Sequence, residues 1–331
     1  MIKTTRTIKG WIKHSKEEIA QIYTLGHPKI APYVSLMAIA DLAASFLIVV
    51  AENVPIDDQK TYGCCTGEEA TGVAKIVDLI IKGAFTELSV LFNYWYSRYI
   101  NDGKAPRSDE GSTILASFQA MMSPYGNAPD TDWPFTSPLN TKPSAKALAD
   151  AVAYSLIKYF TIPDDSTKDP TKNTKILTMK QVLSANSPIG FGSDVRNSIM
   201  NVGTDGLEPY STDDAKDPIA GGQARVIFGF DDTIAIPGAP IKGAFRVRNS
   251  WNTDWGDKGY SWVSYQIFID QQTDCMGVTS ENYPNNNPVP PITPTVNVAQ
   301  AITDAKTAYK QTSITKAKPF INNVITDLGG S

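Results

Sequence analysis

The stretch Gly243-Ala-Phe-Arg-Val-Arg-Asn249-Ser-Trp251-Asn-Thr-Asp-Trp255-Gly256-Asp-Lys-Gly259-Tyr260 is the most informative part of this 331-residue chain. It predicts a strand that delivers Asn249, then a turn braced by Trp251 and Trp255, and then a second strand that opens at Gly259-Tyr260. The stretch therefore places the amide side chain of Asn249 at the end of a strand.

A second informative stretch is Asp58-Gln59-Lys-Thr-Tyr-Gly63-Cys64-Cys65-Thr66. After it, apolar residues recur at intervals of three and four as far as Gly83, which predicts a helix that begins at Cys65. A thiol at the head of a helix has its pKa lowered by the helix dipole, and a backbone N–H there can stabilise an oxyanion. The cysteine pair alone indicates two buried structural thiols. Together with Gln59 and the Asn249 stretch, it indicates a catalytic type of site.

A third stretch is Gly221-Gly222-Gln223-Ala224-Arg-Val-Ile-Phe-Gly229-Phe230-Asp231-Asp232. The three stretches, in this order, closely resemble the signatures of papain-like cysteine peptidases. In that family, Asn-Ser-Trp-Gly-x-x-Trp-Gly-x-x-Gly-Tyr carries the Asn that orients the catalytic His. That His lies in Gly-Gly-His-Ala, before a strand ending in Gly-Tyr-Asp-Asp. Gln223 stands at the position of the His.

The resemblance implies a role for each remaining member of the site. Cys65 corresponds to the nucleophile, and Gln59, six residues upstream, corresponds to the Gln of the oxyanion hole. Cys64 occupies a position that is usually Ser and is expected to be a neighbour only. Thr66 stands where the family often has Trp, which leaves the assignment unchanged. Trp251 and Trp255 shield the Asn–His pair in the family, and here we expect them to maintain the turn and core.

Gln223 changes the chemistry that this site can perform. A cysteine hydrolase needs a group that accepts a proton from the thiol and returns it to the leaving amine. A carboxamide does not titrate near neutral pH, so Gln223 can do neither. Cys65, Gln59, Asn249 and Gln223 are therefore predicted to form a vestigial constellation in which Asn249 hydrogen-bonds Gln223.

No other residue in the sequence is an evident replacement for the missing base. The two histidines, His14 and His27, both precede Cys65 and are expected to be surface or capping residues. Arg225 lies on the same strand face as Gln223. Its pKa is too high for proton transfer, and we expect it to pair with a carboxylate.

The order of elements predicts an α+β, papain-like fold with a helical half, an antiparallel β half and a cleft between them. The expected helices are 65–83, 87–100, one opening at Asp109 and running through 121, 144–159, and one from 178 to 184. The expected strands are 189–191, 224–230, 244–249 and 260–269. The resemblance covers about residues 54 to 270.

Three segments are predicted along the chain. Residues 1–53 form an N-terminal segment packing on the body, with a short helix opening at Ser15, and residues 54–275 form the papain-like domain. Residues 276–331 form a Pro/Asn-rich linker and a C-terminal arm, with short amphipathic helices over 296–309 and 315–328. The arm is expected to bind protein partners.

Composition narrows the class of protein. With 30 basic and 34 acidic residues, a net charge of −4 argues against a nucleic-acid partner. The most apolar run, 30–51, is interrupted by Pro32, Asp41 and Ser45, so no membrane span is expected. Three cysteines and the lack of a signal peptide favour a cytoplasmic or virion location. No cofactor and no metal site is expected.

These observations predict a papain-like pseudopeptidase that acts as a structural or partner-binding subunit of a larger assembly, such as a viral or phage particle. A further hypothesis is that the cleft binds a peptide without cleaving it. The alternative is an active cysteine peptidase or amidase in which Cys65 is the nucleophile and the base is unconventional.

Overall fold

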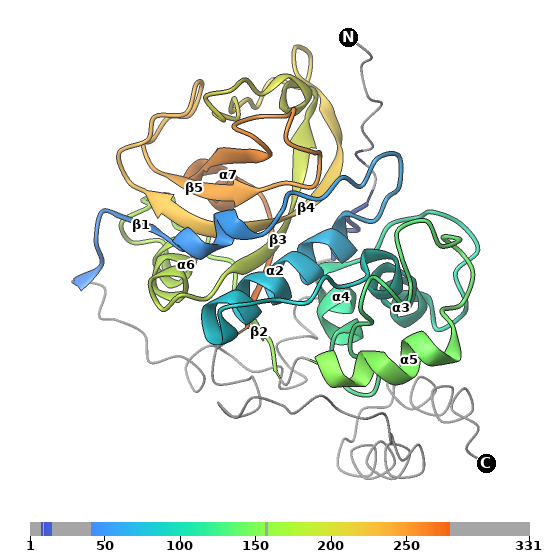
Figure 1. Ribbon diagram of the computed structural model, residues 1–331. Helices are drawn as coiled ribbons and strands as arrows, with labels where there is room; N and C mark the ends of the chain where they lie inside the picture. Colours follow the sequence, from blue (N-terminus) through green and yellow to red (C-terminus); the bar gives the residue numbers. More distant parts are fainter. Residues whose placement is uncertain (1–7, 9, 15–40, 156–157, 279–331) are drawn as a thin grey trace.

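The structure is a computed structural model that describes residues 8, 10–14, 41–155 and 158–278. A helical half and a β half lie side by side, with the long helix α2 (Cys65–Lys82) between them (Figure 1). The rest of the helical half consists of α3 (Val90–Asp102), α4 (Ile114–Ala120) and α5 (Ala145–Ala151). This arrangement confirms the predicted α+β architecture.

Within the described residues, seven strands form one antiparallel sheet in the order β2-β7-β3-β4-β5-β6, with β1 also paired to β4. The strands are β1 (Ser45–Leu47), β2 (Phe160–Thr161), β3 (Ile189–Arg196), β4 (Ile219–Asp231), β5 (Ala244–Arg248), β6 (Tyr260–Ser264) and β7 (Asp274–Gly277). The helices α6 (Thr174–Ser184) and α7 (Tyr265–Asp270) belong to the β half and contact strands of the sheet.

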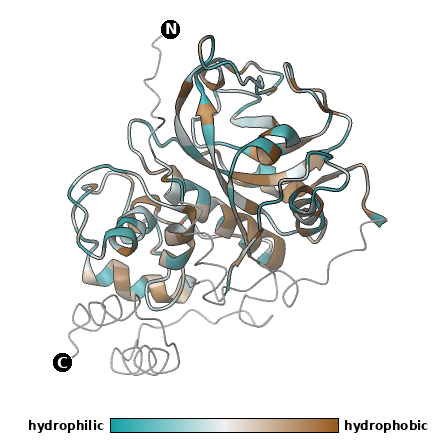
Figure 2. Ribbon diagram, turned by 180° about the vertical axis from the view of Figure 1, so that it is seen from behind, coloured by the Kyte–Doolittle hydropathy of each residue, from teal (hydrophilic) through white to brown (hydrophobic). Residues whose placement is uncertain are grey.

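Helix α2 packs closely on the sheet and connects the two halves. At Gly72 a Cβ atom would lie 3.3 Å from Val226 Cγ2 on β4, so the helix backbone approaches the strand directly. Apolar side chains of both elements, including Val73, Val77 and Ile227, are buried in one cluster. In Figure 2 the hydrophobic stretches gather along the strands and the helices that face them, while the outer loops are mostly hydrophilic.

Three helices begin at other residues than predicted, because the polar side chains that cap them lie at other positions than expected. Helix α3 begins at Val90 rather than Glu87, since Ser89 caps it by accepting from Phe92 N. Helix α6 begins at Thr174 rather than residue 178, since Asn173 is its cap. Helix α4 does not open at Asp109: that carboxylate instead accepts from Gly63 N at 2.8 Å.

Two predicted elements end too late. The α-helix expected to reach residue 159 ends at Ala151, whose carbonyl accepts from Asn127 N at 3.2 Å, and only a 3-10 turn over Val152–Tyr154 continues it. The strand expected over 260–269 stops at Ser264, where the hydroxyl caps helix α7 by accepting from Gln266 N. Both errors arise because a hydrogen bond to a distant or newly capping group overrides the local pattern.

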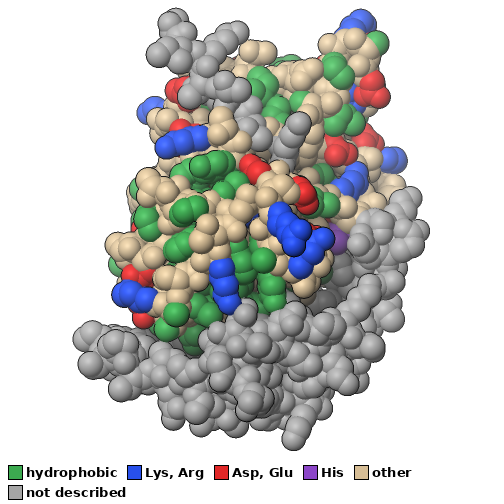
Figure 3. Space-filling view, turned by 90° about the vertical axis from the view of Figure 1, so that its right-hand side faces the viewer, with side chains coloured by type: hydrophobic (Ala, Val, Ile, Leu, Met, Phe, Trp, Pro, Cys, Tyr) green, Lys and Arg blue, Asp and Glu red, His purple; other side chains and the backbone are tan. Residues whose placement is uncertain are grey.

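Some predictions lie outside the described residues: the short helix at Ser15, the first half of the apolar run 30–51, and all but the first three residues of the linker and arm at 276–331. No helix in the described part of the chain is both long and apolar enough to cross a bilayer. On the face drawn in Figure 3, basic and acidic side chains are interspersed among the described residues.

Candidate active site

Cys65 opens helix α2 as predicted, and it is completely buried. The backbone N–H of Ala224 on β4 donates to its sulfur at 3.3 Å. Burial raises the pKa of Cys65 to about 12, and the Ala224 hydrogen bond only partly opposes this. The direction is opposite to that expected from the helix dipole, because removal from water disfavours a thiolate more than the helix end favours it. Cys65 is therefore a protonated thiol at neutral pH.

Gln223 lies in a cluster of three amides. Its Nε2 donates to Gln59 Oε1 at 2.7 Å and to Asn249 Oδ1 at 3.1 Å. Ser250 supports both acceptors: its hydroxyl donates to Gln59 Oε1 at 2.7 Å and its N–H donates to Asn249 Oδ1 at 2.9 Å. The structure thus brings together the predicted site residues, and Asn249 bonds Gln223 as expected. None of these three side chains carries a titratable proton.

The first histidine lies elsewhere. His14 Nδ1 is 2.9 Å from Asp274 Oδ2 on β7, and both residues are buried. Asp274 pairs with Gly192 on β3, and Gly192 pairs with Ala224 on β4. Two strand spacings, about 10 Å in all, thus separate Asp274 from the strand position that contacts Cys65. His14 is not the surface residue that was expected, and His27 lies outside the described residues.

The neighbouring predicted residues have structural contacts. Arg225 pairs with Glu208 and donates to Ser193 Oγ at 3.1 Å, which agrees with the expected carboxylate partner. Trp251 and Trp255 are buried edge to face, 5.4 Å apart. Trp255 Nε1 donates to Ile199 O at 2.7 Å, so this tryptophan holds a neighbouring loop.

Cys64 is also fully buried, packed with Val90, Leu91 and Tyr94. Burial raises the pKa of its thiol well above the ordinary value. Cys64 therefore supplies no thiolate to the site.

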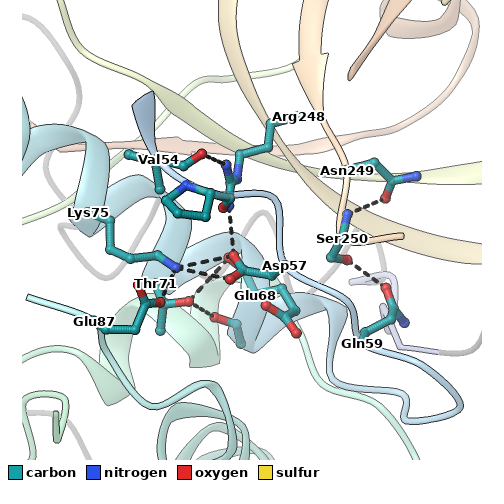
Figure 4. Close-up of polar contacts among 12 residues, drawn as sticks. Val54, Asp57, Gln59, Glu68, Thr71, Lys75, Glu87, Arg248, Asn249 and Ser250 are labelled. Carbon is teal, nitrogen blue, oxygen red and sulfur yellow. Dashed lines mark hydrogen bonds and ion pairs between the residues drawn. The ribbon is translucent and has the colours of Figure 1, made fainter. Parts of the chain in front are cut away.

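A largely buried charged cluster beside the amides was not predicted from the sequence (Figure 4). Arg248 donates to the carbonyl of Val54 at 2.6 Å and to the carboxylate of Asp57 at 2.8 Å. Lys75 Nζ lies 3.2 Å from Asp57 and 2.6 Å from Glu87. The cluster ties strand β5, helix α2 and the loop that leads to Gln59 into one unit. The sequence feature that could have indicated this cluster is the presence of charged residues, Lys75 and Arg248, within a largely apolar helix and strand.

The charges of this cluster perturb the pKa values of its members. Burial alone would raise the pKa of Asp57, but Lys75 and Arg248 outweigh it and lower that pKa. Glu68, one helical turn after Cys64, has a raised pKa because burial dominates and the Asp57 carboxylate adds repulsion. Glu69 also has a raised pKa through burial, opposed only by a hydrogen bond from Ser117.

Residues 10–14 cover the thiol, which the sequence did not indicate beyond the expectation that residues 1–53 pack on the body. A Cβ at Gly10 would lie 2.3 Å from Cys65 Sγ and 2.6 Å from Gly63 O, so only a glycine fits there. Gly10 O accepts from Ser112 N and Ile12 N donates to Ser112 O, both at 2.8 Å. We call residues 10–14 the covering segment.

Solved structures with related folds share this architecture. The cysteine protease xylellain from Xylella fastidiosa superposes with a TM-score of 0.65 at 23% identity, covering 83% of this chain and 98% of that one. Digestive procathepsin L 3 of Tenebrio molitor gives a TM-score of 0.54 at 15% identity, covering 82% of this chain and 83% of that one. The fold is that of papain-like cysteine peptidases.

Sequence comparison gives the family itself. The family described as papain family cysteine protease matches residues 100–283, more than half of the chain, and the protein therefore belongs to that family. The match includes Gln223 and Asn249 but begins after Cys65. An uncharacterized peptidase C1-like protein, L477, of Acanthamoeba polyphaga mimivirus is 27% identical over 217 residues. The aligned part spans 65% of this chain and 65% of that relative's length.

Proposed function

We propose that this protein is a papain-family homologue without peptidase activity, whose former active site holds an extended segment uncleaved and whose role is structural or partner-binding. One observation carries the proposal: Gln223 takes the position of the base, and its side-chain amide donates to the amide oxygens of Gln59 and Asn249. None of these three amides can accept the proton of the Cys65 thiol at neutral pH, and peptide hydrolysis requires such an acceptor.

The covering segment supports the same conclusion independently. A reacting carbonyl carbon must approach the nucleophile to within about 3–3.5 Å. Gly10 occupies that space so closely that even a methyl group would overlap the sulfur. Cys65 is thus both protonated and covered.

The decisive experiment measures turnover of a fluorogenic peptide panel by the full chain and by Cys65→Ala. We expect equal, background rates. Gln223→His alone should stay near background, since the covering segment still blocks the thiol. Gln223→His combined with Trp11→Ala, which loosens the segment, should gain turnover that depends on Cys65. Wild-type turnover that Cys65→Ala abolishes would instead establish an active peptidase with an unconventional base.

We further propose that the protein is a subunit of a larger assembly and that residues 279–331 bind its protein partners. Because one relative is viral, we propose that the protein is located in a virus particle or in the cytoplasm of an infected cell. Light scattering on the full chain and on a chain ending at Val278 would test the assembly. We expect an assembly larger than a monomer only for the full chain. If both chains are monomeric, the proposal is contradicted.

A further inference from the structure

We propose that Gly192, Gly222 and Asp274 form a recognition site for an extended partner peptide of the pattern Gly-Trp-x-x-His, and that the covering segment is its resident ligand. A partner protein carrying that pattern would displace the segment. The inference rests on the proposed function, because a site that cleaved its occupant could not retain it.

The tryptophan of the pattern lies where two neighbouring strands have no side chains. A Cβ at Gly192 on β3 would lie 2.1 Å from Trp11 Nε1, and one at Gly222 on β4 would lie 2.6 Å from Trp11 Cε3. Trp11 is 7% exposed. Any other residue at either glycine would overlap the indole ring, so the sheet surface is shaped for a flat aromatic group of this size.

Asp274 supplies the polar part of the recognition. Its Oδ2 accepts from Trp11 Nε1 at 3.2 Å and lies 2.9 Å from His14 Nδ1, which donates to it. Among the described residues, the side-chain hydrogen bonds of Asp274 all come from the covering segment. A buried carboxylate needs such donors, since an unpaired one is costly. Asp274 therefore selects for an indole N–H and an imidazole three residues later.

The remaining contacts set the conformation rather than the identity of the ligand. Ser112 makes two backbone hydrogen bonds, one to the residue on each side of Trp11, and these bonds are independent of the peptide's side chains. Ile12 is 40% exposed, so its position accepts other residues. Lys13 pairs with Asp194 at 3.1 Å in partial exposure, where ion pairs contribute little. Gly10 must remain glycine because of Cys65 and Gly63.

This occupant is favoured over a nonspecific peptide because its three determinants are contributed by different strands. Gly222 belongs to β4, Gly192 to β3 and Asp274 to β7, which are consecutive in the sheet. The two glycines and the Asp274 carboxylate contact the same ligand within one surface. A surface that bound any extended chain would need only the two hydrogen bonds of Ser112.

The test uses the full chain carrying Trp11→Ala, in which the resident segment is weakened, and a fluorescent peptide with the sequence of residues 8–14. Fluorescence anisotropy should show binding at least about tenfold tighter than to the wild-type chain, whose site is filled. Peptides with Trp11→Ala or His14→Ala should each bind about tenfold or more weakly, and the matched Ile12→Ala peptide should bind equally well.

The peptide substitutions leave the protein unchanged, so a folding defect cannot produce these results. Adding Asp274→Asn to the Trp11→Ala chain should remove the preference for His14, with thermal unfolding recorded as a check on the fold. Equal binding of the native and Trp11→Ala peptides, or no binding of either, would overturn the inference. Mass spectrometry of the recovered peptide separates the two proposals: a cleaved peptide would contradict the proposed function, whereas an intact peptide bound without selectivity would contradict this inference alone.

Discussion

Two buried polar clusters meet beside helix α2, and they differ in kind. The amide cluster of Gln59, Gln223 and Asn249 is neutral. The cluster of Asp57, Lys75 and Arg248 is charged (Figure 4). The charged cluster anchors the backbone that leads to Gln59. The comparison indicates that fixed charges hold the loop which positions Gln59, while the three amide side chains themselves carry no titratable proton.

Removing a charge from the charged cluster should have the largest effect. Lys75 is fully buried and contacts both Asp57 and Glu87, so Lys75→Met removes one of the two cations that pair with Asp57, the other being Arg248, and breaks the ion pair with Glu87. Breaking a buried ion pair in this way costs about 3–5 kcal/mol of unfolding free energy. Urea unfolding of the purified variant measures this loss.

Lys82→Met is the matched control on the same helix. Its side chain is 50% exposed and pairs with Asp78 at i,i+4. We expect a loss of less than about 1 kcal/mol. Equal losses for the two variants would show that the charged cluster does not hold the loop.

The Cys65 thiol should be unreactive. A pKa of about 12, against an ordinary 9.0, leaves about a thousandfold less thiolate at pH 7. Alkylation of Cys65 by iodoacetamide, mapped by mass spectrometry, should therefore be at least about a thousandfold slower than that of a free thiol.

Gly10→Ala should raise the alkylation rate by forcing the covering segment away from the sulfur, while Ile12→Ala on the same segment should leave it unchanged. Rapid alkylation of the wild-type chain near pH 6 would mean that Cys65 is an activated thiolate.

Disrupting the amide cluster should cost less than disrupting the charged one. Gln223→Met keeps the volume but removes the donor to Gln59 and Asn249, and both acceptors retain a donor from Ser250. We expect a loss of about 1–2 kcal/mol. Because no member of the cluster titrates, the loss measured by urea unfolding should be the same from pH 5 to pH 8. A loss that changes with pH would indicate an ionisable partner.

The smallest effect concerns Glu69. Its folded pKa is raised above the ordinary 4.5, so the folded carboxyl stays protonated while the unfolded one ionises as the pH rises. The unfolded state then gains relative stability as pH increases above 4.5 toward the folded pKa. Glu69→Gln removes this loss and should stabilise the fold by about 1 kcal/mol at pH 7 but not at pH 4. An unchanged difference between the two pH values would contradict the raised pKa.

The site residues were predictable from sequence because each lies in a stretch of specific local form. Cys65 begins a long apolar-periodic helix, and Asn249 follows a strand before a tryptophan-braced turn. The pairing of Arg225 with a carboxylate was expected because the pKa of arginine is too high for proton transfer, although Glu208 could not be named in advance.

The covering segment and Asp274 could not be found in the same way. Their contacts join residues about 260 positions apart, and short stretches around Trp11 and Asp274 have no pattern typical of a site. The raised pKa of Cys65 was missed for a related reason, since the burial that causes it depends on β4 and the covering segment. The late ends predicted for α5 and β6 came from hydrogen bonds that the local pattern does not encode.

The burial of all three cysteines has a consequence for redox chemistry. Cys64, Cys65 and Cys275 are free thiols without exposure to solvent, and oxidants such as peroxide attack accessible thiolates. The folded chain should keep its thiols reduced even outside a reducing compartment. Formation of a sulfenic acid at Cys65 would therefore indicate that Gly10 had moved away from the sulfur and exposed it to the oxidant.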